Sequence, residues 1–289
     1  MVSRAGVPLL LAAMAALLLS PGCGIVGPAA SLARGQALVN KGDYAGARKA
    51  FDEALRRRPT DGQLAMQVAA IWAQAKQYQE AIAVLQRSLK ARPNADVYTL
   101  LGDICTAAQQ YPEAERAYES AYSMGSRSPA LLNNLGYLWA DQEKSLPRAV
   151  AMLEDAARQK PNDPNIQDSL GWAYYKSALE QRRTGNAEAA RKLLAQARDQ
   201  VEQAVDALPG QAEVVYHLGV IYAAMGYEED ARAQLRRALI LAPRMKAAKD
   251  ALNALGQPKP AQPAPPAPRK PPPPPPAEPN HVPTAGRSV

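Results

Sequence analysis

The sequence predicts an all-α protein, a right-handed solenoid of six helix-turn-helix repeats closed by a C-terminal capping helix. Three observations point to this fold. Helical patterns recur at a fixed spacing, and both Pro59 to Pro93 and Pro209 to Pro243 are 34 positions apart. Strong helix formers such as Ala, Leu, Gln, Glu and Arg dominate, and the chain has a single Phe. Small residues also recur at fixed places within each repeat, where two helices are expected to cross closely.

Two near-copies of one short pattern occur in the middle of the chain. The segments 132–137 and 167–172 each contain a Leu-Gly pair, and a large aromatic residue stands three positions after each Gly. Between the two copies lie Ala149, the large apolar Leu153 and Ala156, and this stretch ends at Pro161. This order resembles the tetratricopeptide repeat pattern, over about residues 31–243. The resemblance implies stacked pairs of antiparallel helices, whose first helices line a concave groove.

The expected solenoid covers residues 23–257. Its repeats are expected at residues 28–61, 62–94, 95–128, 129–163, 164–211 and 212–245, with a capping helix at 244–256. The fourth repeat has one extra residue near Ser145, which predicts a longer turn between its helices. The fifth is extended and predicts helices from Asn165 to Arg183 and from there to about Leu208.

Packing accounts for the small residues of the pattern. Five Gly residues are expected to let paired helices approach closely: Gly35, Gly102, Gly136, Gly171 and Gly219. Four large residues are expected to fill the space between repeats: Phe51, Leu85, Tyr118 and Leu153. Cys105 replaces an aromatic residue of the pattern and is predicted to be a small buried residue. His217 has no nearby Cys or His in the sequence, which favours a structural role.

The first 22 residues have the features of a secretory signal peptide. Arg4 precedes an apolar run from Val7 to Leu19, which is too short to span a bilayer. The Gly22-Cys23 junction resembles the lipobox of bacterial lipoproteins, which implies lipidation of Cys23; Pro21 departs from that pattern. Ordinary cleaved secretion and an uncleaved anchor are the alternatives. Gly24 after the Cys implies sorting to the outer membrane, facing the periplasm; otherwise the protein would be periplasmic or secreted.

Residues 258–289 form a Pro-rich tail with six consecutive prolines, typical of an extended, water-facing segment. The formal net charge of +7 is spread unevenly: Arg4 adds one positive charge, the tail adds three, and three remain for the body. A nearly balanced body argues against nucleic-acid binding, which needs a concentrated basic face.

The candidate binding residues follow from the positions that face the groove in the resembling family. They are Asn133, Tyr137, Asp141, Asp168, Trp172, Tyr175, Lys176 and Tyr216. Four aromatic residues among polar neighbours are typical of interface hot spots. The alternative is that some of them pack against the next helix or the long fifth repeat.

No phosphate-binding loop, nucleophile elbow or metal-binding His motif is present, so neither an enzyme nor a cofactor, metal site or small-molecule substrate is expected. The chain resembles repeat-containing bacterial envelope lipoproteins, which act as adaptors. We therefore expect a scaffold that docks a peptide or helix of a protein partner while its lipid holds it at the membrane. The alternative is a structural envelope protein whose Pro-rich tail spans or binds cell wall, or docks a Pro-binding partner.

Overall fold

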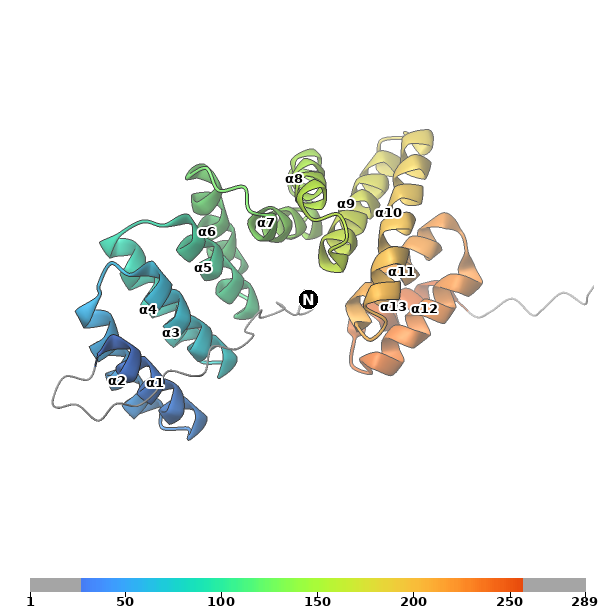
Figure 1. Cartoon of the computed structure of the whole chain (residues 1–289). Coiled ribbons are helices and arrows are strands. Elements are labelled where there is room, and N and C mark those ends of the chain that lie inside the picture. Colours follow the sequence, from blue (N-terminus) through green and yellow to red (C-terminus); the bar gives the residue numbers. More distant parts are fainter. Residues whose placement is uncertain (1–26, 257–289) are drawn as a thin grey trace, which may run out of the picture. The chain divides into compact units, whose positions relative to one another are not determined.

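The computed structural model describes residues 27–256, and this part of the chain consists of thirteen α-helices without a strand (Figure 1). The predicted signal peptide, Cys23 and the Pro-rich tail lie outside the described residues. Twelve helices form six consecutive antiparallel pairs and one further helix follows, which confirms the all-α solenoid. The pairs are α1 (Pro28–Asn40) with α2 (Tyr44–Arg57), α3 (Gly62–Gln74) with α4 (Tyr78–Ala91), α5 (Ala95–Ala107) with α6 (Tyr111–Ser123), α7 (Pro129–Asp141) with α8 (Leu146–Gln159), α9 (Pro164–Arg183) with α10 (Ala187–Ala207), and α11 (Ala212–Met225) with α12 (Glu228–Leu241); α13 (Lys246–Ala254) is the last helix.

Local sequence signals set the ends of these helices. Side chains of Asp61, Asn94 and Ser128 accept hydrogen bonds from backbone N–H groups at the starts of α3, α5 and α7. Pro129 and Pro164 occupy the first turns of α7 and α9, where a missing N–H costs nothing. Each signal therefore closes one helix and starts the next without help from distant residues.

The deviations expected in the fourth and fifth repeats are present. Four residues separate α7 from α8, whereas three separate α3 from α4. At this longer turn, Glu143 (φ 55°) and Ser145 (φ 42°) adopt the left-handed conformation. The helices of the fifth pair have 20 and 21 residues, compared with 13 or 14 in the other pairs. Their added turns form a separate small cluster, in which Ala178, Ala190 and Leu194 are buried.

Close helix crossing at Gly explains the repeated small residues. A Cβ atom added at Gly136 would lie 2.8 Å from Leu153 Cγ and 3.2 Å from the carbonyl oxygen of Ala149. Ala149 and Leu153 are themselves fully buried, so neither has free space into which to move. The expected close approach of the paired helices at Gly is thus confirmed, and Leu153, which was expected between repeats, packs against the Gly of its own repeat. Added Cβ atoms at Gly35 and Gly102 would likewise overlap the rings of Phe51 and Tyr118.

Where an aromatic residue stands three positions after the Gly of a Leu-Gly pair, it donates a hydrogen bond to a Glu of the preceding repeat. Trp139 Nε1 donates to Glu115, and the hydroxyls of Tyr174 and Tyr222 donate to Glu154 and Glu202, which lie on the preceding second helices; the three distances are 2.9, 2.9 and 2.7 Å. Each bond joins one repeat to the one before it. Cys105 occupies the same slot in α5 and is buried, as predicted.

The last helix covers the apolar side of α12 through Ala248, which is fully buried. Arg232 of α12 is 2% exposed and its guanidinium donates to the carbonyl oxygens of Leu255 and Gly256, at 2.7 and 2.6 Å. The bonds satisfy carbonyl groups at the end of α13 that have no partner within the helix. The sequence pattern did not reveal this role of Arg232.

Candidate functional site

The predicted binding residues fall on three successive first helices. Asn133, Tyr137 and Asp141 are spaced by four on α7, and Asp168, Trp172 and Lys176 are spaced by four on α9. Residues four apart lie on one side of a helix, so each set forms a stripe. Tyr216 lies on α11, beside His217. We call the side formed by these stripes of α7, α9 and α11, together with Asp103 of α5, the first-helix face.

Trp172 is the centre of an aromatic cluster on this face. Its ring stacks on Tyr175 at 5.1 Å and on His217 at 4.1 Å, and the ring of Tyr216 lies 6.2 Å away. Trp172 is 6% exposed, whereas Tyr175 and Tyr216 are half-buried. The structure therefore brings three of the four predicted aromatic residues together, and Trp172 supports Tyr175 and Tyr216 from beneath rather than facing solvent.

Asp168 is also buried, and its partner is His217, a residue that the sequence pattern left as structural. Nδ1 of His217 lies 2.8 Å from Asp168 Oδ1, and His217 is 2% exposed. Burial alone lowers the pKa of His217, but the charge and hydrogen bond of Asp168, with Glu213 and Asp141 nearby, raise it overall. The pair ties α9 to α11 beneath the aromatic cluster.

Tyr137 links the two outer helices of the face. Its hydroxyl donates to Glu213 Oε1 at 3.2 Å, which connects α7 to α11 across α9. Burial raises the pKa of Glu213, and burial together with the charge of Glu213 raises the pKa of Tyr137 well above its usual value. Glu213 was not among the predicted site residues, although its spacing of four from His217 places the two on one stripe.

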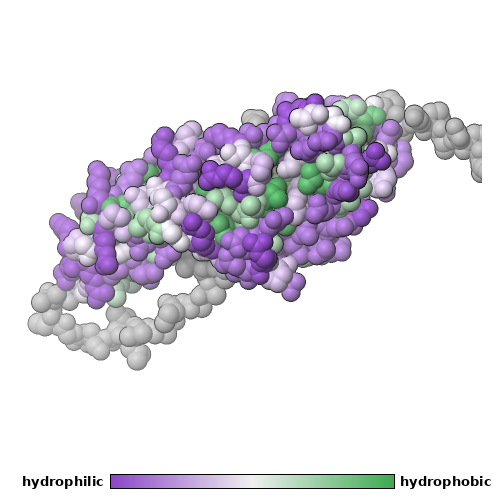
Figure 2. All heavy atoms as spheres, turned by 90° about the horizontal axis from the view of Figure 1, so that it is seen from above, coloured by the Kyte–Doolittle hydropathy of each residue, from purple (hydrophilic) through white to green (hydrophobic). Residues whose placement is uncertain are grey.

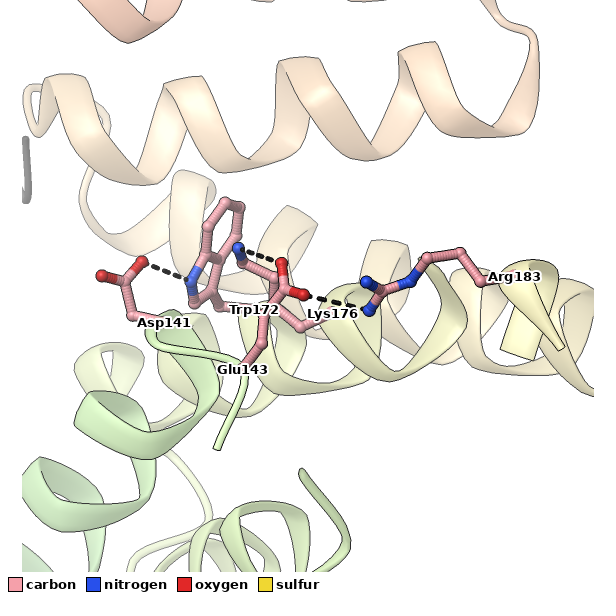
Figure 3. A network of polar contacts seen from close by, with 5 residues as sticks. All are labelled: Asp141, Glu143, Trp172, Lys176 and Arg183. Atoms are coloured by element: carbon pink, nitrogen blue, oxygen red, sulfur yellow. Dashed lines mark hydrogen bonds and ion pairs between the residues drawn. The ribbon is translucent and has the colours of Figure 1, made fainter. Parts of the chain in front are cut away.

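Asp141 and Lys176 lie beside Trp172, as Figure 3 shows. Trp172 Nε1 donates to Asp141 Oδ1 at 3.2 Å, and Lys176 Nζ lies 5.1 Å from the centre of the Trp172 ring. Lys176 also donates to Glu143 at 3.2 Å, and Arg183 donates to the other oxygen of that carboxylate at 3.0 Å (Figure 3). An internal ammonium group is thus held against the ring of Trp172 by the turn after α7.

Asn133 belongs to a chain of hydrogen bonds that runs to α5. Its amide donates to Asn134 at 3.0 Å, and Asn134 donates to Asp103 at 2.7 Å. Tyr118 also donates to Asp103, at 2.8 Å, and burial raises the pKa of Asp103 to about 6. Asn133 Oδ1 is buried and has no hydrogen-bond partner among the described residues.

The arrangement combines aromatic rings with hydrogen-bonded polar groups from three first helices. In the described part of the chain, no group of three His, Cys, Asp or Glu residues is arranged to hold a metal ion. None of the helices described for residues 27–256 is long and apolar enough to cross a membrane. The surface view in Figure 2 shows separated hydrophobic patches among hydrophilic residues. The docking role of the eight predicted residues stays a prediction, and the structure adds Asp103, Glu143, Glu213 and His217 to their surroundings.

Comparison with known proteins identifies the repeats. The tetratricopeptide repeat family model matches residues 32–96, 100–164 and 175–246, more than half of the chain. No curated protein matches the sequence.

Several solved structures share the fold. YrrB, described as a tetratricopeptide repeat protein with an unusual peptide-binding site, is 23% identical with a TM-score of 0.50, covering 71% of this chain and 98% of YrrB. PilW, a type IV pilus biogenesis factor, is 16% identical with a TM-score of 0.56, covering 78% of this chain and 98% of PilW. The Cut9–Hcn1 complex gives 21% identity and a TM-score of 0.60, with 80% of this chain but 43% of the matched chain covered. At these identities, the likeness concerns the fold.

Proposed function

Because this chain belongs to the tetratricopeptide repeat family, we propose that it is a non-catalytic scaffold of the bacterial cell envelope that docks a partner on its first-helix face. Proteins of this fold are protein–protein interaction scaffolds, since stacked repeats present an extended surface. The envelope location, the lipid anchor and the docking of a peptide or helix are the specific parts of the proposal.

The aromatic cluster is the observation that carries the docking proposal. Tyr175 and Tyr216 remain half-buried around the buried Trp172, and the half-buried Tyr137 lies on the adjacent first helix α7. Tyr and Trp are enriched among residues that dominate binding energy, because they bury a large area at a low entropic cost. Trp172 is fixed by Asp141 and stacked against Tyr175 and His217, so the surrounding rings are pre-ordered for a partner.

Two structural neighbours support a peptide ligand and an envelope role. YrrB is described as having a peptide-binding site, and PilW as acting in type IV pilus biogenesis. The N-terminal sequence adds the argument for anchoring, since a signal-like segment ends at the Gly22-Cys23 junction. A diacylated Cys23 would hold the scaffold at the outer membrane, because two acyl chains give stable membrane attachment.

Site-specific photo-crosslinking in cells tests the docking surface. A photoreactive phenylalanine at Tyr216 or Tyr175 is expected to capture a defined partner, whose binding is then measured with purified proteins. The same group at Tyr227, an exposed aromatic between α11 and α12, is the matched control. Equal capture from Tyr216 and Tyr227 would place the partner elsewhere and contradict docking on the first-helix face.

Mass spectrometry of the mature N-terminus tests the anchor. A diacylated N-terminal Cys23 is expected, and Cys23→Ser is expected to release the protein from the membrane fraction. Cleavage at another position, or an unmodified Cys23, would contradict the lipid anchor.

Deletion of residues 258–289 distinguishes docking on the first-helix face from the alternative in which the Pro-rich tail binds the partner. Docking on the first-helix face predicts that partner binding is retained after the deletion.

A further inference from the structure

Positive charge is distributed unevenly between the two helices of each repeat. Helices α3, α5, α7 and α11 contain neither Lys nor Arg, although the whole chain carries a formal net charge of +7. The second helix of each pair, from α2 to α12, contains at least one Lys or Arg. Lys176 and Arg183 of α9 donate to Glu143 in the turn after α7, and Arg182 donates to the carbonyl oxygen of Ala224 in α11. Helices α5, α7 and α11 therefore carry carboxylates but neither Lys nor Arg.

These carboxylates have neutral donors as partners. Asp141 accepts from Trp172, Glu213 accepts from Tyr137, and Asp103 accepts from Tyr118 and Asn134. No ion pair among residues 27–256 involves Asp103, Asp141 or Glu213. The basic groups near them have other partners: His217 is hydrogen-bonded to Asp168, and Lys176 over the Trp172 ring donates to Glu143. Asp103, Asp141 and Glu213 are thus not neutralised by an ion pair with Lys or Arg among these residues, and Lys176 and Arg183 of α9 pair with Glu143 instead.

Keeping Asp103 and Glu213 half-buried works against folding. Burial raises the pKa of Asp103 to about 6 and also raises that of Glu213, so the ionised forms are disfavoured in the folded protein. Half-buried charges that weaken the fold are more often found at functional sites than elsewhere. A ligand that brought a cation to this face would offset that cost.

The aromatic side chains beside the carboxylates suit a cation as well. The charges of Asp141 and Glu213 act on the half-buried ring of Tyr216 and, after burial, raise its pKa further. A cation is attracted both by carboxylates and by the faces of aromatic rings. The Nζ of Lys176 over Trp172 shows that one ring of the cluster already holds an ammonium group. Asn133, on the same stripe of α7, keeps a buried Oδ1 without a hydrogen-bond partner among the described residues.

We propose that the first-helix face docks a cationic segment of a partner protein, with Lys or Arg side chains placed between Asp141, Glu213 and the ring of Tyr216. This inference rests on the proposed function and specifies the chemistry of its partner. Anionic partners such as acidic peptides or nucleic acid are disfavoured by the same charges. Half-buried rings beside carboxylates favour Arg and Lys flanked by apolar residues in the partner. The charged group contacts the carboxylates, and the hydrophobic stem contacts the rings.

Selection of peptides tests this charge preference. The full chain is presented to a display library of short random peptides, and the selected peptides are synthesised and their affinities measured by fluorescence anisotropy. We expect enrichment in Lys and Arg, and at least about a tenfold loss of affinity when these residues are replaced by Gln in the peptide. We also expect affinity to fall as NaCl rises from about 0.05 M to about 0.5 M, since added salt screens ion pairs.

Matched variants locate the binding. Asp141→Asn with Glu213→Gln retains the acceptors for Trp172 and Tyr137 while removing two charges, and should weaken the selected peptides at least about tenfold. Glu113→Gln with Glu188→Gln removes two exposed charges from α6 and α10 and should leave affinity within about twofold. Thermal unfolding followed by circular dichroism verifies that both double variants fold.

The outcomes separate this inference from the function on which it rests. Selected peptides that no longer bind after Tyr216→Ala show that the first-helix face is used. If these peptides are not enriched in Lys or Arg, or if they bind the Asp141→Asn, Glu213→Gln variant equally well, the cationic partner is overturned and the scaffold function stands. Failure of the chain to select any peptide over the bare support would overturn both.

Discussion

The first and second helices of the repeats share one packing scheme but treat charge differently. On the second helices, Arg87 pairs with Asp52 at 2.8 Å and Arg48 pairs with Glu80, both between neighbouring repeats and near the surface. On the first-helix face, Asp141 and Glu213 accept bonds from Trp172 and Tyr137 instead. Surface ion pairs stabilise little, whereas buried polar groups depend strongly on their partners. The second helices therefore present exposed ion pairs, and the first helices hold a pre-ordered polar and aromatic surface.

The largest effect is expected at the buried pair of His217 and Asp168. His217→Ala leaves the Asp168 carboxylate buried without its partner and removes a ring stacked on Trp172, so we expect a loss of about 3–5 kcal/mol of unfolding free energy. Urea denaturation near pH 7 measures this loss. Adding Asp168→Asn to His217→Ala should recover part of it, and no recovery would show that the unpaired charge is not the cause.

A smaller effect, dependent on pH, is expected at Asp103. Because burial raises its pKa from 3.8 to about 6, the folded protein binds this proton more tightly than the unfolded chain. The resulting stability is present below the unfolded pKa and is lost as the pH rises through 6. Asp103→Asn retains the acceptor for Tyr118 and Asn134, so it should be about 1–3 kcal/mol more stable than the wild type near pH 8.

Denaturation curves at several pH values check this prediction. The advantage of Asp103→Asn should vanish near pH 4, where the wild-type carboxyl is protonated. Glu53→Gln, which alters a surface pair of α2, should change stability by less than about 0.5 kcal/mol at every pH. An advantage of Asp103→Asn that does not change with pH would contradict the burial argument.

The packing shared by both helices is tested at Gly136. Gly136→Ala places a methyl group against Leu153 and the backbone of Ala149, and overpacking of this kind is expected to cost about 1–3 kcal/mol. Gly210→Ala is the control, because a Cβ there meets no atom within 4 Å. Thermal unfolding of both variants measures the difference. Equal stability of the two variants would contradict the close packing of α7 against α8 at Gly136.

The smallest effect is expected at the surface pair of Arg87 and Asp52. Arg87→Ala should lower the unfolding free energy by less than about 1 kcal/mol, since both side chains are well exposed and salt screens the pair. A double-mutant cycle with Asp52→Asn isolates the coupling. A coupling as large as that of His217 with Asp168 would erase the distinction between the two sets of helices.

Sequence alone determined the helices and the way in which they pair. Capping residues, the Gly of each crossing and the Ala and large apolar positions are local signals, because each acts within one repeat and its neighbour. The long fifth pair was expected from Asn165 to Arg183 and then to about Leu208, and the helices run from Pro164 to Arg183 and from Ala187 to Ala207. The expected burial of Cys105 follows from the same pattern.

Tertiary structure alone decided which polar side chains meet. Asp168 and His217 are 49 positions apart, and Tyr137 and Glu213 are 76 apart. Periodicity places each residue on one side of its own helix, but the angle and offset between neighbouring helices determine which side chains touch. A spacing of four therefore predicted the stripes of α7 and α9, while the burial of Trp172 and Asp168 and the carboxylates without Lys or Arg partners depended on how three helices pack together.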